Sequence, residues 1–176
     1  MTDGELARLI REHAYLEGDF VLRSGRRSSY YLDKYRFETR PELLRALGER
    51  LAARAREAAP NASRLAGPEL GAVVLAASAS LAGGLPFLIV RKEAKAYGTE
   101  RALEGAYEEG EEVCLIEDVV TSGGAAVHAV EALRAAGLSC RAAVCVVDRE
   151  EGGAAALAGA AVRLHALFRA QDVSRA

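Results

Sequence analysis

A short segment of the chain, residues 113–125, combines carboxylates, hydroxyls and glycines at close spacing. Its apolar run ends in two adjacent carboxylates, Glu117 and Asp118, and Thr121, Ser122 and two glycines follow. Carboxylate oxygens accept hydrogen bonds from ribose hydroxyls and also help to hold divalent cations. Small and hydroxyl residues at the start of a helix leave backbone N–H groups open to a phosphate. The pattern therefore predicts that the carboxylates face a sugar and that the loop binds its phosphate.

The same segment also has an ordinary structural interpretation, as a strand, a turn and a helix with capping residues. Glycines before a helix are weak signals when they are taken singly. The full order of apolar strand, two acids, two valines, Thr-Ser and two glycines is far more demanding. Neither the Walker A pattern nor G-x-G-x-x-G occurs, so the sequence does not favour those nucleotide-binding motifs.

The elements that must position this segment follow from the hydrophobic pattern after residue 63. Strand patterns occur at residues 64–67, 85–90, 111–118, 139–150 and 160–168. Helix patterns occur between them, at residues 72–84, 123–137 and 152–159. This alternation predicts an α/β fold with a mostly parallel central sheet and right-handed crossovers. Ligands of such sheets bind at the carboxyl ends of the strands, where Glu117 and Asp118 are expected.

The first part of the chain follows a different pattern. Residues 3–16 predict an amphipathic helix, and β-prone runs at 20–22 and 30–32 predict a hairpin. Thr39 and Glu42 have the spacing of a capping box at the start of a further helix, which extends to about residue 59. We expect these elements to form a hood over the sheet.

The length and composition limit the classes of protein that remain. The 176 residues suit one domain, expected over 1–176 with the hood at 1–60 and the α/β core at 61–176. The net charge of −2 argues against a nucleic-acid binder that neutralises phosphates. No stretch reaches the ~20 apolar residues that span a bilayer, and no signal peptide is recognisable, so we expect a cytoplasmic protein.

Cysteines and histidines give no sign of a structural metal. Cys114, Cys140 and Cys145 all lie in apolar runs without C-x-x-C spacing, which predicts reduced, buried thiols. The three histidines are far apart, so a zinc site has little support. His128 is expected to be a half-buried structural residue on the helix after the phosphate loop.

The segment VCLIEDVVTSGGA, residues 113–125, resembles the phosphoribosyl pyrophosphate (PRPP) binding motif of type I phosphoribosyltransferases. That motif is specific for the fold and for PRPP, but not for the base. FVLRSGRRSSYYLD at 20–33 resembles the N-terminal signature of orotate phosphoribosyltransferases, and RKEAKAYGTERALEG at 91–105 resembles their catalytic loop. With GPELG at 67–71 and VVDR at 146–149, five motifs follow the order of that family.

The resemblance implies a reaction. Orotate and PRPP give orotidine 5′-monophosphate and pyrophosphate in pyrimidine synthesis, with Mg²⁺ held mainly through PRPP and no metal ligand assigned directly. The implied partners are these small molecules and a second copy of the chain, in a homodimer with two shared active sites, without nucleic acid or membrane. Departure of pyrophosphate builds positive charge on the sugar, so the chemistry calls for cations around the leaving group and for exclusion of water.

The resemblance also assigns roles to residues. Catalytic roles fall to Arg91, Lys95 and Asp118, and those for orotate fall to Tyr31, Leu32, Thr121 and Arg149. The residues expected to contact PRPP are Arg23, Glu69, Leu70, Arg91, Lys92, Lys95, Tyr97, Glu117, Asp118, Val119, Val120, Thr121, Ser122, Gly123, Gly124 and Ala125. Glu117 and Asp118 would bind the ribose, residues 121–125 the 5′-phosphate, and the backbone of Glu69 and Leu70 the pyrophosphate. Arg91, Lys95 and residue 97 would reach the neighbouring subunit's site.

The sequence departs from the family at three places. Residue 97 is Tyr where relatives typically have His, and a phenol with a pKa of ~10 is a poor acid–base group at neutral pH. Residue 23 is Arg where many relatives have Lys. The positive charge is kept, but a planar guanidinium replaces a compact ammonium. The turn PELG lacks the Tyr-Lys pair of some relatives, which removes one cation.

Alternatives remain open at this stage. Taken singly, Arg91 and Lys92 suit a solvated strand end, Tyr30 and Tyr31 suit core aromatics, and Arg149 suits the rim of a surface. Only their joint order favours a site. A phosphoribosyltransferase for another base, or a PRPP-binding regulator, would share residues 113–125. A purine salvage enzyme is not expected to carry the other motifs, and a regulator is expected to carry a basic face or an added DNA-binding segment.

Overall fold

The computed structural model describes residues 1–21, 25, 27–92 and 102–176. Within these residues a central sheet has the strand order β5-β4-β3-β6-β7-β8. Its strands are β3 (Arg64–Pro68), β4 (Phe87–Val90), β5 (Leu103–Glu104), β6 (Glu112–Val120), β7 (Ser139–Asp148) and β8 (Arg163–Arg169). All neighbouring pairs are parallel except β4 and β5. The predicted α/β class with a mostly parallel sheet is confirmed.

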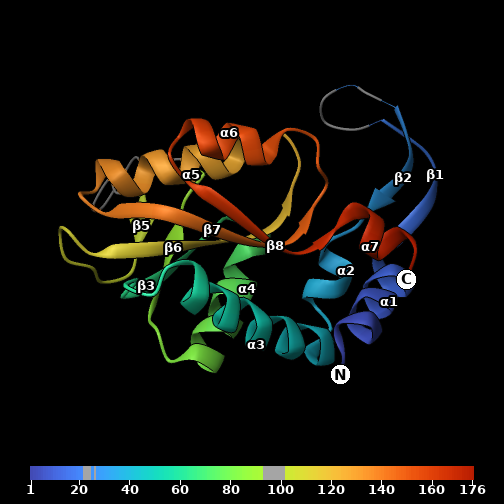
Figure 1. Ribbon diagram of the computed structural model, residues 1–176, viewed down its shortest axis with the longest axis horizontal. Helices are drawn as coiled ribbons and strands as arrows, with labels where there is room; N and C mark the ends of the chain where they lie inside the picture. The colour runs from blue at the N-terminus through green and yellow to red at the C-terminus, as the bar shows by residue number, and fades with distance from the viewer. Residues whose placement is uncertain (22–24, 26, 93–101) are drawn as a thin grey trace.

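Helices cover both faces of this sheet (Figure 1). The helices α3 (Pro41–Ala58) and α4 (Gly71–Gly83) lie on one face, and α5 (Gly124–Ala135) and α6 (Gly153–Gly159) lie on the other. Strand β6 serves both layers because successive side chains point to opposite faces. Cys114 and Ile116 belong to the core on the α3–α4 side, whereas Val113 and Leu115 belong to the core on the α5 side. A strand buried on both faces is a continuous apolar run, as the sequence has it.

The hood gathers at one end of the sheet, with both chain termini (Figure 1). It contains α1 (Asp3–Ala14), the antiparallel hairpin of β1 (Tyr15–Val21) and β2 (Arg27–Leu32), and the short helix α2 (Tyr35–Glu38). The C-terminal helix α7 (Ala170–Ser174) packs against α1. Neither α2 nor α7 was expected, because helices of four or five residues are too short to show a hydrophobic period.

The predicted capping box at the start of α3 is wrong. The Thr39 hydroxyl donates to the Tyr35 carbonyl over 2.6 Å and closes α2. Arg40 is the N-cap of α3 and makes no side-chain capping bond, while Pro41 occupies the first turn. A capping box does occur at α1, between Thr2 and Glu5. The spacing of a capping box occurs in the sequence at the starts of both α1 and α3. In the structure, however, Thr39 lies at the end of the unexpected helix α2.

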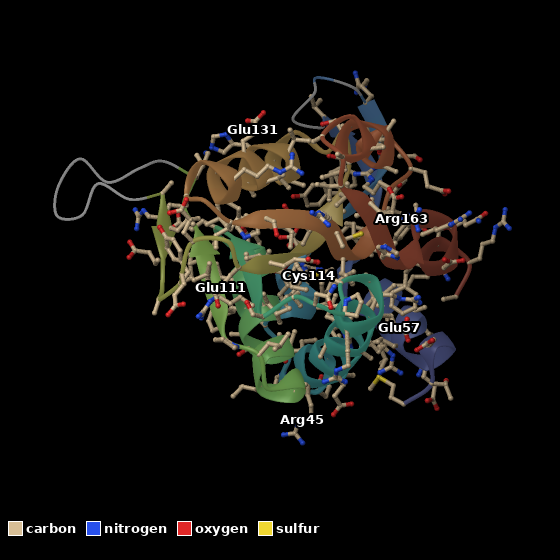
Figure 2. All side chains as sticks on the ribbon, turned by 60° about the vertical axis from the view of Figure 1, so that its left-hand side comes forward. Arg45, Glu57, Glu111, Cys114, Glu131 and Arg163 are labelled. Atoms are coloured by element: carbon tan, nitrogen blue, oxygen red, sulfur yellow. The ribbon has the colours of Figure 1, made fainter. Side chains whose placement is uncertain are left out.

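The cysteines are as predicted. Cys114, Cys140 and Cys145 are free and buried, and Figure 2 shows Cys114 in the middle of the molecule while Arg45 and Glu131 lie at its periphery. Burial raises the pKa of the Cys114 thiol to about 12, so the thiol is not a nucleophile at neutral pH. In the part of the chain that the structure describes, no helix is long and apolar enough to cross a membrane.

Candidate active site

A pocket of about 900 Å³ opens at the carboxyl ends of the parallel strands. Strands far apart in sequence reach it: the ends of β3, β4, β6 and β7 contribute, together with the loop before α5 and the hood around Lys34. The whole segment 117–125 lines the pocket. The pocket wall also contains other predicted site residues, namely Tyr31, Glu69, Arg91, Lys92 and Arg149. The structure therefore brings most of the described predicted residues together.

The two carboxylates Glu117 and Asp118 are buried rather than solvated, with exposed fractions of 6% and 3%. Strand β6 runs two residues further than expected, to Val120, so both acids lie within the strand. Desolvation, followed by the neighbouring Asp118 charge, raises the pKa of Glu117 to about 8. The backbone N–H of Val119 donates to Asp118 Oδ1 over 2.5 Å, and Lys34 Nζ donates to Oδ2 over 2.5 Å. Asp118 is thus the carboxylate whose charge the site stabilises.

The loop between β6 and α5 depends on Gly123. Its φ of +81° lies in the left-handed region, and a Cβ there would stand 2.9 Å from the backbone of Gly153. Only glycine fits both constraints. No side chain caps the first turn of α5, while Gly124 has open space beside its Cα. Backbone N–H groups at such a helix start attract anions, so this turn is suited to a phosphate.

Arg149 is held inside the pocket by a ring and an acid. Its guanidinium lies 4.7 Å from the centre of the Tyr30 ring and its Nη2 lies 3.0 Å from Glu151 Oε1. The side chain is 8% exposed, and its Nε is buried without a hydrogen-bond partner. The Tyr30 ring in turn stacks on Tyr15, with 4.9 Å between centroids. A planar cation fixed in this way presents its fork to a planar carboxylate.

The opposite wall of the pocket is organised by Glu69. Its carboxylate accepts from the backbone N–H of Lys92 over 3.1 Å and lies 3.7 Å from Arg91 Nη1. Arg91 Nη1 also lies 3.5 Å from Glu104 on β5. The sequence predicts a backbone role for Glu69, and its side chain additionally ties the end of β3 to the residues after β4.

Several predicted residues do not fall on the pocket wall. The Leu32 side chain is 8% exposed and belongs to the core, and Leu70 is 70% exposed on the surface. Arg23, Lys95 and Tyr97 lie outside the described residues. The half-buried structural role expected for His128 is wrong: the residue is exposed and lines the pocket, because it lies on the outer side of the first turns of α5.

Sequence reasoning missed Lys34 and Glu38. Lys34 is the N-cap residue of α2 and lines the pocket, and Glu38 ends that helix with 1% exposure. Neither Glu38 carboxylate oxygen has a hydrogen-bond partner. Burial, then the Asp118 charge, raises the pKa of Glu38 to about 8. The signal available in the sequence was a Lys and a Glu four residues apart directly after the hairpin, which is the spacing of one helical turn.

Gly71 explains how the acids of two elements fit together. A Cβ at this first residue of α4 would stand 2.3 Å from Asp118 Oδ2 and 2.8 Å from both Glu38 carboxylate oxygens. Glycine therefore leaves the room in which the hood and the core bring Glu38 and Asp118 to one helix start. The fixed dipole of α4 favours negative charge at that place.

The fold and the residues that line this pocket define the class, and comparison with known proteins agrees. The phosphoribosyl transferase domain family matches residues 36–163, so the chain has the type I phosphoribosyltransferase fold. The orotate phosphoribosyltransferase of Methanocella arvoryzae is 44% identical over 172 residues, with 97% of each chain covered. That of Halobacterium salinarum is 45% identical over 172 residues, covering 98% of this chain and 96% of the relative. The chain belongs to the orotate phosphoribosyltransferase family.

A solved structure shows the same architecture. The crystal structure of Mycobacterium tuberculosis orotate phosphoribosyltransferase in complex with PRPP superposes with a TM-score of 0.81 at 29% identity, covering 98% of both chains. The similarity includes the hood as well as the sheet, since nearly the whole of each chain is covered.

Proposed function

We propose that this protein transfers the 5-phosphoribosyl group from PRPP to orotate, giving orotidine 5′-monophosphate and pyrophosphate for pyrimidine synthesis. One observation carries the proposal: two buried carboxylates at the end of β6 lead directly into the uncapped, glycine-dependent start of α5. A sugar next to its 5′-phosphate matches that arrangement of acceptors and donors. Membership of the family and the PRPP complex of the mycobacterial relative support it.

Each part of PRPP has a counterpart in the pocket. The 5′-phosphate accepts hydrogen bonds from the backbone and hydroxyls of residues 121–125, and the ribose hydroxyls donate to Asp118 and Glu117. The pyrophosphate extends toward Glu69, Arg91 and Lys92, where β3 and β4 end. This orientation directs the anomeric carbon toward the centre of the pocket, so both reacting groups can meet there.

Orotate binds on the side of Arg149. The guanidinium already pairs with a carboxylate, that of Glu151, and orotate offers a carboxylate of the same geometry. Tyr31 supplies a ring beside the base, Thr121 a hydroxyl and Leu32 its backbone. The C–O bond to pyrophosphate breaks as the bond from the orotate ring nitrogen to the anomeric carbon forms, and the proton of the ring nitrogen passes to an oxygen of the released pyrophosphate. Catalysis consists of holding the two reactants in line and neutralising the leaving group.

Mg²⁺ fits this pocket as a cation that arrives with PRPP. Among the described residues, no group of three or more acidic, histidine or cysteine side chains forms a metal site. The acids Glu69, Asp118 and Glu151 each lie against a cation of the protein, so oxygen atoms of PRPP would supply most ligands. When bound, the ion adds positive charge to the departing pyrophosphate.

We also propose a homodimer in the cytoplasm. Helix α4 carries no charged residue in its thirteen positions, yet Val74 and Leu81 are 40% and 90% exposed, and Leu70 before it is 70% exposed. Helices that are apolar all round are normally buried, so a second copy is the expected cover. Sharing of the active sites rests on the resemblance of residues 91–105. The three reduced thiols suit a reducing compartment.

The test is a spectrophotometric assay of orotate loss with PRPP and Mg²⁺, with adenine, hypoxanthine and uracil as competing bases. We expect orotate consumption that stops when PRPP is left out and that equals pyrophosphate release. Turnover of another base in place of orotate would overturn the assignment of the acceptor. Tight PRPP binding without turnover of any base would instead identify a regulator.

A further inference from the structure

Lys34 stands between the ribose carboxylates and the turn that starts α4. Its side chain comes from the hood, is 31% exposed and lines the pocket together with Glu69, Arg91 and Lys92. Its ammonium donates to Asp118 Oδ2, the same oxygen that lies against Gly71. The ammonium is thus positioned beside the ends of both β3 and β6.

We propose that Lys34 is a PRPP-binding residue whose ammonium leaves Asp118 and pairs with the pyrophosphate when the substrate enters. The proposal rests on the proposed function, because it takes the ribose to be bound at Glu117 and Asp118. Among the residues that the structure describes, it adds a cation of the hood to a leaving-group site otherwise made by residues at the ends of β3 and β4.

Competition for one oxygen atom drives the exchange. Asp118 Oδ1 already accepts from the backbone of Val119, so Oδ2 is the oxygen left for a ribose hydroxyl. Oδ2 is also the partner of Lys34 Nζ. Entry of the ribose weakens that ion pair, and the lysine has a flexible four-carbon stem and a point charge that adapts to a phosphate. The pyrophosphate attached to the same ribose is the nearest new anion.

The charges around the pocket support this role. Arg91 lies against Glu69 and Glu104, and Arg149 lies against Glu151. The carboxylates of those acids have no proposed contact with the ribose. The partner of Lys34, in contrast, is the carboxylate that the ribose of PRPP needs, so PRPP binding itself releases this ion pair.

A purely structural role makes a different prediction. Lys34 would then only neutralise Asp118 in a site that also contains the buried Glu38. Breaking a buried ion pair leaves an uncompensated charge and lowers stability. It would also disturb the ribose carboxylate, so binding of any ribose phosphate would suffer equally, with or without pyrophosphate.

The experiment measures the affinities of two variants for two ligands, PRPP and ribose 5-phosphate, by titration calorimetry in the presence of Mg²⁺. Lys34→Met removes the charge, and Lys34→Gln removes it while keeping a donor for Asp118. We expect both to weaken PRPP binding by about tenfold to a hundredfold, the value of one charge-assisted hydrogen bond. Ribose 5-phosphate, which lacks the pyrophosphate, should bind within about threefold of wild type because Asp118 remains free for it. Thermal unfolding verifies that each variant is folded.

Two controls separate the ways in which the idea can fail. Arg36→Met, two residues along the same helix and paired with Asp33, should leave both affinities unchanged. Asp118→Asn should weaken both ligands. Equal losses of the two ligands in Lys34→Met and Lys34→Gln, or wild-type affinity for PRPP in Lys34→Gln, would overturn the role of Lys34. If Asp118→Asn also leaves both ligands unaffected, the proposed ribose site itself is wrong.

Discussion

At the scale of residues, the three buried carboxylates Glu38, Glu117 and Asp118 have unequal surroundings. Asp118 has a cation and a backbone N–H as partners, whereas Glu38 has neither. The pKa values of Glu38 and Glu117 are both raised to about 8. Burial therefore favours the protonated form of both glutamates.

The raised pKa of Glu38 makes the stability of the fold depend on pH. The groups facing it are Lys34 on its own helix, Asp33 before that helix, and Asp118 on β6. The folded protein keeps the Glu38 proton up to about pH 8, whereas the unfolded chain releases it near the ordinary value of 4.5. Between these two pH values the unfolded state binds fewer protons, so stability falls as pH rises.

The variant Glu38→Gln removes this dependence. It keeps the shape of the side chain and carries no charge at any pH, so we expect it to be more stable than wild type by about 1–3 kcal/mol at pH 8. At pH 5, where Glu38 is protonated in the folded state, the difference should shrink to within about 0.5 kcal/mol. Urea unfolding at pH 5, 6.5 and 8 measures the trend. A constant difference between the two proteins over that range would contradict the raised pKa.

At the scale of elements, the turn between β6 and α5 depends on its first glycine much more than on its second. Gly123→Ala introduces a Cβ at a φ of +81° and against the backbone of Gly153. We expect a loss of about 1–3 kcal/mol in unfolding free energy, since the left-handed conformation alone costs roughly 1–2 kcal/mol, together with weaker PRPP binding because the turn must shift. The matched variant for stability is Gly124→Ala, where no atom lies within 4 Å. Urea unfolding of the two should differ clearly, and equal stability would show that the turn tolerates a side chain.

The sequence predicted the elements that are long or strongly patterned. The alternation of strand and helix patterns after residue 63 predicted the parallel sheet. The motif at 113–125 predicted the strand end, loop and helix start that line the pocket, because such ends and starts have local signals. The helices α2 and α7 have too few residues for such signals. Lys34 and Glu38 were missed for the same reason: their importance comes from packing of α2 against α4, which brings both side chains to Asp118 and which no local pattern encodes. The surroundings of Asp118 likewise depend on the hood, whose Lys34 pairs with it and whose Glu38 lies at the same helix start.

At the scale of the whole molecule, the face of α4 that points away from the sheet is the feature that a single chain leaves unexplained. Leu81, at the end of this uncharged helix, is 90% exposed. Burying a leucine side chain contributes about 1.5–3 kcal/mol, so a partner surface over α4 would gain much from this residue. The helices on the opposite side of the sheet, α5 and α6, have no exposed large hydrophobic side chain: α6 consists mostly of alanine, and α5 carries Glu131 and Arg134.

We therefore expect Leu81→Glu to shift the protein from dimer to monomer, because a charge buried in an apolar contact without a partner is strongly unfavourable. Light scattering coupled to size-exclusion chromatography measures the mass, and Ala158→Glu, an exposed position on α6 across the sheet, is the matched control. If the active sites are shared, the monomer should also lose orotate turnover at low protein concentration and regain it as concentration rises. A monomeric Leu81→Glu protein with full turnover would show that each subunit works alone, and a dimeric one would show that α4 is not the interface.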